Sequence, residues 1–176
     1  MLFSKYQRRR SLPASLAAGL GVNMCADLWS FALSTYARPG VEDACLRLQA
    51  QGADVCLMLC GLWLEQRGVA PETSRLQALR QVAEPWQAEV VGPLRQVRTQ
   101  WRAMAQQDAE LGALRERVKA LELEAERLLL SRLEGVAQVW PMAKAGAQAW
   151  LEGLAAETAN LDHDALHQLR AAVTNT

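Results

Sequence analysis

Apolar side chains recur along the chain at spacings of three and four residues, the repeat of an α-helix that buries one face. The pattern predicts helices over 24–37 and 41–51, the first with Asn23 as a candidate N-cap. Arg38-Pro39-Gly40 separates them, because proline disfavours helix in the preceding residue. The predicted buried faces are Leu28, Ala32 and Tyr36 in the first helix and Val41, Ala44, Cys45 and Leu48 in the second.

A third helix is predicted over 55–66, with Asp54 placed to cap it and Gly68 to end it. It is apolar nearly all round, so it should lie at the centre of the domain. The next helix should run from Pro71 to Ala83. Pro85 is expected to begin a further helix that Pro93 kinks, with the stripe Trp86, Val90, Leu94, Val97 and Trp101.

Between residues 108 and 133 the apolar residues follow a seven-residue (heptad) repeat. Its apolar positions are Leu111, Leu114, Val118, Leu121, Ala125 and Leu128, and charged residues fill the gaps. Two interpretations remain open. The helix packs its stripe on its own bundle, or it pairs with a second chain as a coiled coil.

Composition strengthens the helical prediction. The chain has 30 Ala and 28 Leu among 176 residues and no Ile, a balance that favours helices over strands. We therefore expect an all-α fold, a compact helical bundle with a long amphipathic helix and a helical C-terminal extension. The longest apolar run, 55–64, is far shorter than the roughly 20 residues of a membrane span.

Residues 1–23 differ from the rest, because they contain four basic side chains and no acidic one. We expect a disordered basic extension, with translation starting at Met24 as one explanation. A secretory signal or a basic arm that binds an acidic partner are the alternatives. The other predicted units are a helical bundle domain over 24–135 and an Ala-rich extension over 136–176, whose last helix Asp162 can cap.

The net charge of zero combines two regions of opposite charge. Residues 1–23 carry a net of +4, and residues 24–176 hold fifteen basic and nineteen acidic side chains, a net of −4. This balance gives no reason to expect nucleic acid as a partner. The cysteines are Cys25, Cys45, Cys56 and Cys60, which we interpret as buried thiols of a cytoplasmic protein, with disulfide bridges or metal binding as the alternatives.

Motifs for chemistry are sparse. His163 and His167 lie four apart on a polar helix, and we interpret them as solvated rather than metal-binding. The sequence contains no phosphate-binding loop, no Gly-x-Gly-x-x-Gly and no Gly-x-Ser-x-Gly elbow. We therefore assign no catalytic residue, no cofactor and no metal, and we lean toward a protein that is not an enzyme.

Aromatic and basic residues supply the candidate binding site. Tryptophan more often fills a core than forms a ligand cage. Even so, a pocket at one end of the bundle could be framed by Trp29, Tyr36, Arg38 and Trp86, with Arg95 extending from the Pro93 kink.

Four short sequence motifs resemble those of a known family. They are DLWSFA at 27–32, YARPGV at 36–41, GADV at 52–55 and PWQAEVVGPLR at 85–95. Together they resemble an uncharacterised proteobacterial family of small all-α proteins, over about residues 24–135. The family has no assigned activity, so the resemblance implies a bacterial, cytoplasmic protein and transfers no site residue.

Two classes of function follow. The first is a non-enzymatic interaction protein whose amphipathic helices bind a protein partner or a second copy in a homodimer. The second is a small-molecule-binding protein or enzyme with an apolar pocket around Trp29, Tyr36, Arg38 and Trp86.

Overall fold

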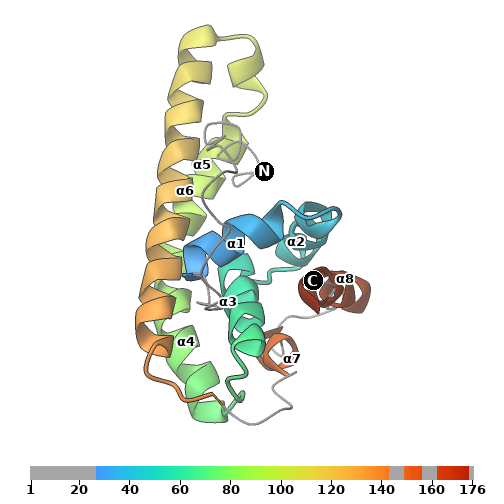
Figure 1. Ribbon diagram of the computed structural model, residues 1–176. Helices are drawn as coiled ribbons and strands as arrows, with labels where there is room; N and C mark the ends of the chain where they lie inside the picture. The colour runs from blue at the N-terminus through green and yellow to red at the C-terminus, as the bar shows by residue number, and fades with distance from the viewer. Residues whose placement is uncertain (1–26, 143–148, 156–161, 175–176) are drawn as a thin grey trace, which may run out of the picture.

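The computed structural model describes residues 27–142, 149–155 and 162–174, and it confirms the all-α bundle (Figure 1). The elements in chain order are α1 (Leu28–Tyr36), α2 (Val41–Ala50), α3 (Val55–Gln66), α4 (Thr73–Trp86), the π-helix η3 (Gln87–Val91), α5 (Gly92–Gln100), the short 3₁₀-helix η4 (Met104–Gln106), α6 (Ala109–Ala137), α7 (Trp150–Ala155) and α8 (His163–Thr174). The predicted N-terminal extension 1–23, Asn23 and Cys25 lie outside the described residues.

Helix α3 is the centre of the bundle, as its all-round apolar sequence predicts. Every residue from Cys56 to Leu64 is buried, and α1, α2, α4, α6, α7 and α8 all pack against it. Asp54 is the N-cap, with its side chain accepting from the backbone N–H groups of Cys56 and Leu57. The predicted bounds 55–66 are confirmed, because cap and apolar run both mark the same start.

Helices α1 and α2 lie across one side of α3. The N-cap of α1 is Asp27, whose side chain accepts from the Ser30 N–H, so this helix begins four residues later than predicted. All the residues predicted for the two buried faces are buried. Gly40 joins the helices with φ of +79°, a left-handed conformation in which a side chain would be strained.

The prediction that Pro85 begins a new helix is wrong. The chain stays helical from Thr73 through α4, η3 and α5 to Gln100, with Pro85 inside α4. The disturbance comes before Pro93, where the Gly92 N–H bonds to the carbonyl of Gln87, five residues back. A Cβ on Gly92 would lie 2.8 Å from that oxygen, so glycine fits the close approach. The wider π turn accommodates the proline ring, which would otherwise clash with a carbonyl of the preceding turn.

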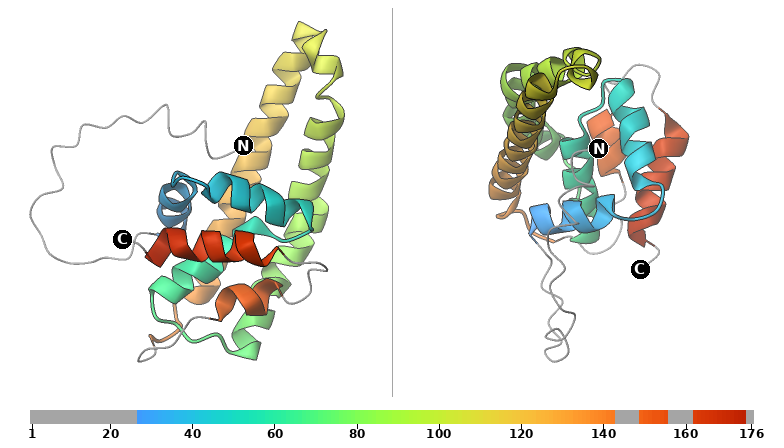
Figure 2. Two further views of the ribbon diagram at one scale, coloured as in Figure 1. Left: turned by 90° about the vertical axis from the view of Figure 1, so that its right-hand side faces the viewer. Right: turned by 90° about the horizontal axis from the view of Figure 1, so that it is seen from above.

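Helices α4, η3 and α5 run antiparallel to α6, which has 29 residues and is about 43 Å long. The pair forms one side of the molecule, and its far end projects beyond the other helices as an arm (Figures 1 and 2). Asp108 caps α6 by accepting from the Leu111 N–H at 3.0 Å. Near the other end of α6, Glu134 accepts from the Leu28 N–H at 3.3 Å and so ties α6 to α1.

Helices α7 and α8 close the side of the bundle opposite α6 (Figure 2, right). Trp150 is fully buried, and its indole N–H donates to the Val69 carbonyl at 2.6 Å. Asp162 accepts from the Ala165 N–H at 2.9 Å, the capping contact predicted for the last helix. Both helices contribute to the same hydrophobic core as α1–α4, while the boundary at 135/136 stays a prediction.

Within these three described ranges, no helix combines the length and apolar character that crossing a membrane requires.

Candidate functional site

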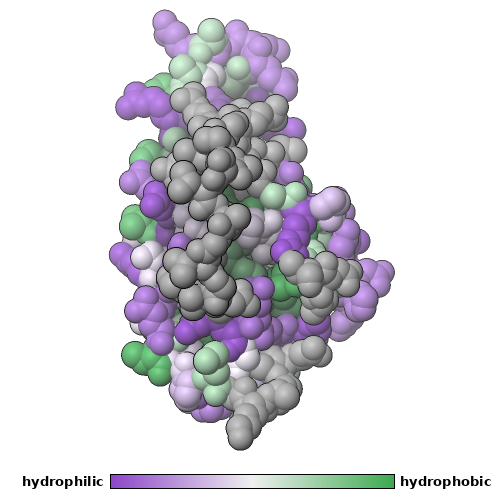
Figure 3. Space-filling view, in the orientation of Figure 1, coloured by the Kyte–Doolittle hydropathy of each residue, from purple (hydrophilic) through white to green (hydrophobic). Residues whose placement is uncertain are grey.

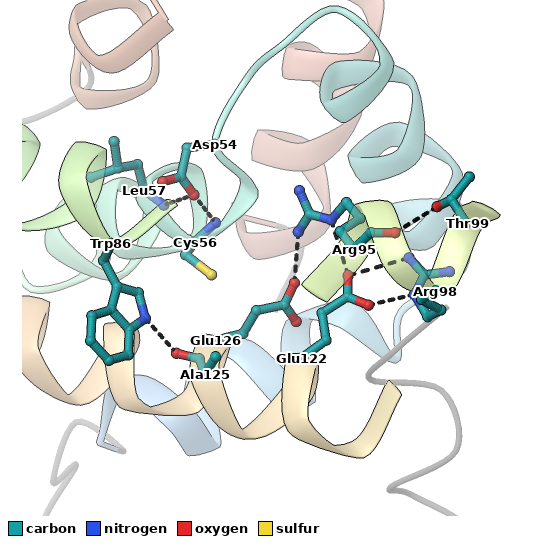
Figure 4. Close-up of polar contacts among 10 residues, drawn as sticks. All are labelled: Asp54, Cys56, Leu57, Trp86, Arg95, Arg98, Thr99, Glu122, Ala125 and Glu126. Atoms are coloured by element: carbon teal, nitrogen blue, oxygen red, sulfur yellow. Dashed lines mark hydrogen bonds and ion pairs between the residues drawn. The ribbon is translucent and has the colours of Figure 1, made fainter. Parts of the chain in front are cut away.

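A buried ion-pair network joins α5 to α6 at the base of the arm (Figure 4). It consists of Arg95 and Arg98 on α5 and Glu122 and Glu126 on α6. Glu122 is fully buried, and Glu126 is 5% exposed. Arg95 donates from Nε to Glu122 Oε1 at 3.0 Å and from Nη2 to Glu126 Oε1 at 2.9 Å, so one guanidinium bridges two turns of α6.

Arg98 is the second cation on Glu122. Its Nη2 donates to Glu122 Oε1 at 3.2 Å, and its Nε forms a close contact with Glu122 Oε2. Both oxygens of this buried carboxylate therefore accept from guanidinium groups, which is the condition under which a buried charge is tolerated. The charges can meet because each pair lies on one face of its helix. Arg95 and Arg98 are three residues apart on α5, and Glu122 and Glu126 are four residues apart on the facing helix α6.

Side chains from α1 and α2 complete the surroundings of Arg95. With its amide oxygen turned toward the guanidinium, Gln49 accepts from Arg95 Nη1 at 2.8 Å and from Nη2 at 3.0 Å. The Tyr36 ring is buried nearby, and this burial raises the pKa of its phenol, a shift that Glu126 reinforces and Arg95 opposes. Burial alone would lower the pKa of Arg95, but the two glutamates outweigh it and raise that pKa.

Two carboxyl groups in this region have pKa values near neutrality. Burial raises the pKa of Glu126 to about 7 against the opposing charge of Arg95, and it raises the pKa of the α3 cap Asp54 to about 6. Asp54 Oδ1 accepts from Cys56 N at 2.8 Å and from Leu57 N at 3.2 Å. One oxygen of each, Asp54 Oδ2 and Glu126 Oε2, is buried with no hydrogen-bond partner among the described atoms, which disfavours the charged forms.

An open groove of about 620 Å³ lies on a different side of α6, against α4 and η3. Trp86 forms part of its wall, held by a hydrogen bond from its indole N–H to the Ala125 carbonyl at 2.9 Å. The Arg132 guanidinium lies over the Trp86 ring, 3.8 Å from its centroid. The remaining lining residues are Gln81, Val82, Pro85, Glu89, Val90, Gly135 and Val136.

The five residues predicted to bind a ligand lie in several environments. Tyr36 and Arg95 share the surroundings of the ion-pair network, and Trp86 lines the groove. Trp29 lies beside α6, where Arg127 stands 5.5 Å from its ring centroid. The Arg38 side chain donates to the Ala172 carbonyl of α8. The structure therefore brings Tyr36 and Arg95 together and places Trp29 and Arg38 among other neighbours.

The sequence analysis missed the acidic members of the network. In the heptad pattern, Glu122 and Glu126 are two of the charged residues between apolar positions, and Asp54 is predicted only to cap a helix. The available signal was the pairing of an acidic i,i+4 spacing on one long helix with a basic i,i+3 spacing on the helix before it.

The outer face of α6 carries three of the four leucines that the heptad pattern marked. Leu114, Leu121 and Leu128 are 46%, 52% and 48% exposed. The buried side of α6 is instead formed by Glu122, Ala125, Glu126, Leu129, Leu130, Leu133 and Ala137. In the space-filling view, hydrophobic side chains interrupt the hydrophilic surface along the edge where α6 runs (Figure 3).

The other candidate groups have simpler environments. Cys45, Cys56 and Cys60 are buried with free thiols, and burial raises the pKa of each, that of Cys45 to about 12. His163 and His167 are exposed on α8. Among residues 27–142, 149–155 and 162–174, no three His, Cys, Asp or Glu side chains are grouped so as to hold a metal ion.

Comparisons with known proteins give a family but no function. Searches against curated proteins and against solved structures produced no match. The model of a family described as "Protein of unknown function (DUF2390)" matches residues 27–133, a range that holds α1–α6 without the end of α6 and includes the whole ion-pair network. The resemblance to an uncharacterised family is thereby confirmed, and the chain belongs to this family of proteins of unknown function.

Proposed function

We propose that the protein is a non-enzymatic interaction protein that binds an amphipathic helix of a protein partner, or of a second copy, on the outer face of α6. The observation that carries the proposal is the row Leu114, Leu121 and Leu128, each about half exposed and spaced by seven residues. Seven residues are two helical turns, so the three leucines form a straight apolar line. A line of this kind fits the apolar seam of another helix.

The ion-pair network supports this function because it sets the rotation of α6. Arg95 and Arg98 hold Glu122 and Glu126 toward α5, which fixes the directions in which the other side chains of α6 point. Leu121 directly precedes Glu122 and is one of these side chains. The arm also carries the first turns of α6 beyond the remaining helices, where a partner has access to them (Figure 1).

The alternative function, a small-molecule site framed by Trp29, Tyr36, Arg38 and Trp86, has weaker support. Of these four residues, only Trp86 lines the groove. Asp54 and Glu126 have the near-neutral pKa values that acid–base catalysis uses, but ion-pair networks that are purely structural shift pKa values in the same way.

We also infer that the protein acts in the cytoplasm and on protein rather than nucleic acid. The three buried free thiols suit a reducing compartment. The net charge of −4 over residues 24–176 does not favour binding to phosphate backbones.

Site-specific photo-crosslinking in the producing cell tests the proposed function. A photoreactive amino acid replaces Leu121 in one full-length variant and Ala120 in the control; Ala120 is also exposed but lies about 100° away around the helix. Sequencing of the crosslinked peptides should show adducts from position 121 to an amphipathic helical segment, and few from position 120. Equal adducts from both positions, or none from 121, would contradict the proposal.

A further inference from the structure

The outer face of α6 carries charges as well as leucines, and their order is informative. Counting 100° per residue, four charged side chains lie within about 60° of Leu121 around the helix. Along the chain they are Glu110, Arg117, Glu124 and Arg132, all exposed, and Arg132 also lies over the Trp86 ring at the groove. Their signs alternate, so the face is neither a uniform acidic nor a uniform basic surface.

This order is self-complementary about Leu121. Leu114 and Leu128 lie seven residues before and after it. Glu110 and Arg132 lie eleven residues before and after it, and Arg117 and Glu124 lie four before and three after. If a second α6 is related to the first by a two-fold axis at Leu121, the two helices run antiparallel. Each leucine then faces a leucine, and each charged side chain lies beside one of opposite sign.

We propose that the partner helix is α6 of a second copy, paired antiparallel about a two-fold axis at Leu121. Leu121 then meets the partner's Leu121, and Leu114 meets the partner's Leu128. Arg117 lies beside the partner's Glu124, and Glu110 beside the partner's Arg132. A two-fold interface requires a patch that is complementary to itself, which is the property this face has.

The parallel arrangement is disfavoured by the same charges. Two α6 helices side by side in the same direction would set Glu110 beside the partner's Glu110 and Arg132 beside the partner's Arg132. Like charges at such positions oppose association, and the energetic preference for the antiparallel direction follows. A different protein would need the same alternating order of acidic and basic side chains on its helix, whereas a second copy of this chain has that order already.

The geometry of the molecule permits this pairing. Helix α6 lies along one edge, and α2 and α8 lie on the far side of the bundle (Figures 1 and 2). The leucines of one α6 and the flanking charges form a small contact, so we expect a dimer that dissociates on dilution rather than a permanent one. Higher salt should weaken it, because the charge pairs are exposed.

This inference rests on the proposed use of the outer face of α6, and charge reversal in the full-length protein tests it. The measurement is the dimer dissociation constant from sedimentation over a concentration series. Arg117→Glu should weaken dimerisation about tenfold, since two attractive pairs per dimer become repulsive. Glu124→Arg should do the same, and the double variant Arg117→Glu/Glu124→Arg should restore the affinity of the unmodified protein.

Leu121→Gln should abolish the dimer, while Glu116→Gln, an exposed change on another side of α6, should leave it intact. Far-ultraviolet circular dichroism verifies that each variant is folded. A monomer at every concentration, or a dimer insensitive to Leu121→Gln, would overturn the self-pairing. So would a double variant no better than the single ones. Crosslinks from position 121 to a different protein would then leave the proposed function standing without the self-pairing.

Discussion

The two faces of α6 hold the side chains that a simple hydrophobic pattern would assign the other way round. The inner face buries Glu122 and Glu126, and the outer face leaves Leu114, Leu121 and Leu128 about half exposed. The difference lies in the neighbours: α5 offers two arginines to the inner face, whereas the outer face lies at the edge of the bundle. The rotation of a long helix is thus decided by the chemistry of the helix beside it as well as by its own apolar spacing.

A buried ion pair contributes less to net stability than its contacts suggest, because taking both charges out of water is costly. Removing one partner is a different matter, since it leaves the other charge buried and unpaired. The inner face of α6 should therefore be sensitive to single substitutions, and the outer face should tolerate them.

The largest effect is expected for Arg95→Ala. It leaves Glu122 with Arg98 alone and takes the Arg95 guanidinium away from the buried Glu126, so the free energy of unfolding should fall by about 3 kcal/mol. Urea unfolding at neutral pH measures the change. Arg102→Ala, at an exposed position just beyond α5, is the control and should stay within about 0.5 kcal/mol. Equal stability of the two variants would show that the network does not hold α6.

Two leucines of α6 give the next contrast. Leu133 is fully buried on the inner face, and Leu133→Ala should cost about 2–5 kcal/mol through lost burial and a residual cavity. Leu128 is 48% exposed on the outer face, and Leu128→Ala should cost less than about 1 kcal/mol. Thermal unfolding at low protein concentration compares them without any contribution from association. Similar losses at both sites would contradict the assignment of the two faces.

Stability should also depend on pH through the inner face. The pKa of Glu126 is raised from 4.5 to about 7, and that of Asp54 from 3.8 to about 6. The folded protein therefore holds protons that the unfolded chain releases, and stability falls as the pH rises from about 4 to 7. Glu126→Gln should remove on the order of 2 kcal/mol of this decline and leave the part due to Asp54. A pH dependence that is unchanged in the variant would contradict the raised pKa of Glu126.

The smallest effect is expected at the start of α6, in the arm. Asp108 caps the helix through the Leu111 N–H, and Asp108→Ala should cost about 1 kcal/mol or less. Hydrogen exchange should show faster opening of the first turns of α6 with no change near Leu133. A loss of stability as large as that of Arg95→Ala would mean that the arm and the inner face unfold as one unit.

Local features of the fold could be predicted from the sequence where one segment contains the whole cause. The Asp54 cap, the all-apolar α3 and the buried face of α2 are of this kind. The rotation of α6 is not, because it depends on contacts between distant segments. Glu122 meets residues 24 and 27 positions earlier, and spacing alone does not reveal which side of a helix such partners occupy. Of the residues in and around the ion-pair network, the sequence singles out Arg95 and Tyr36, and their binding of a ligand stays a prediction.

The π turn of η3 changes the direction in which all the later side chains of this helix point. A helix with one residue extra in a single turn continues in the same direction but is rotated by about 100° relative to an uninterrupted helix. Arg95 and Arg98 come directly after this turn. In a helix wound regularly from Thr73 onward, both arginine side chains would be rotated by about 100° from their present directions relative to Glu122. Through the two arginines that follow it, the π turn before Pro93 thus contributes to the orientation of the leucines on the outer face of α6.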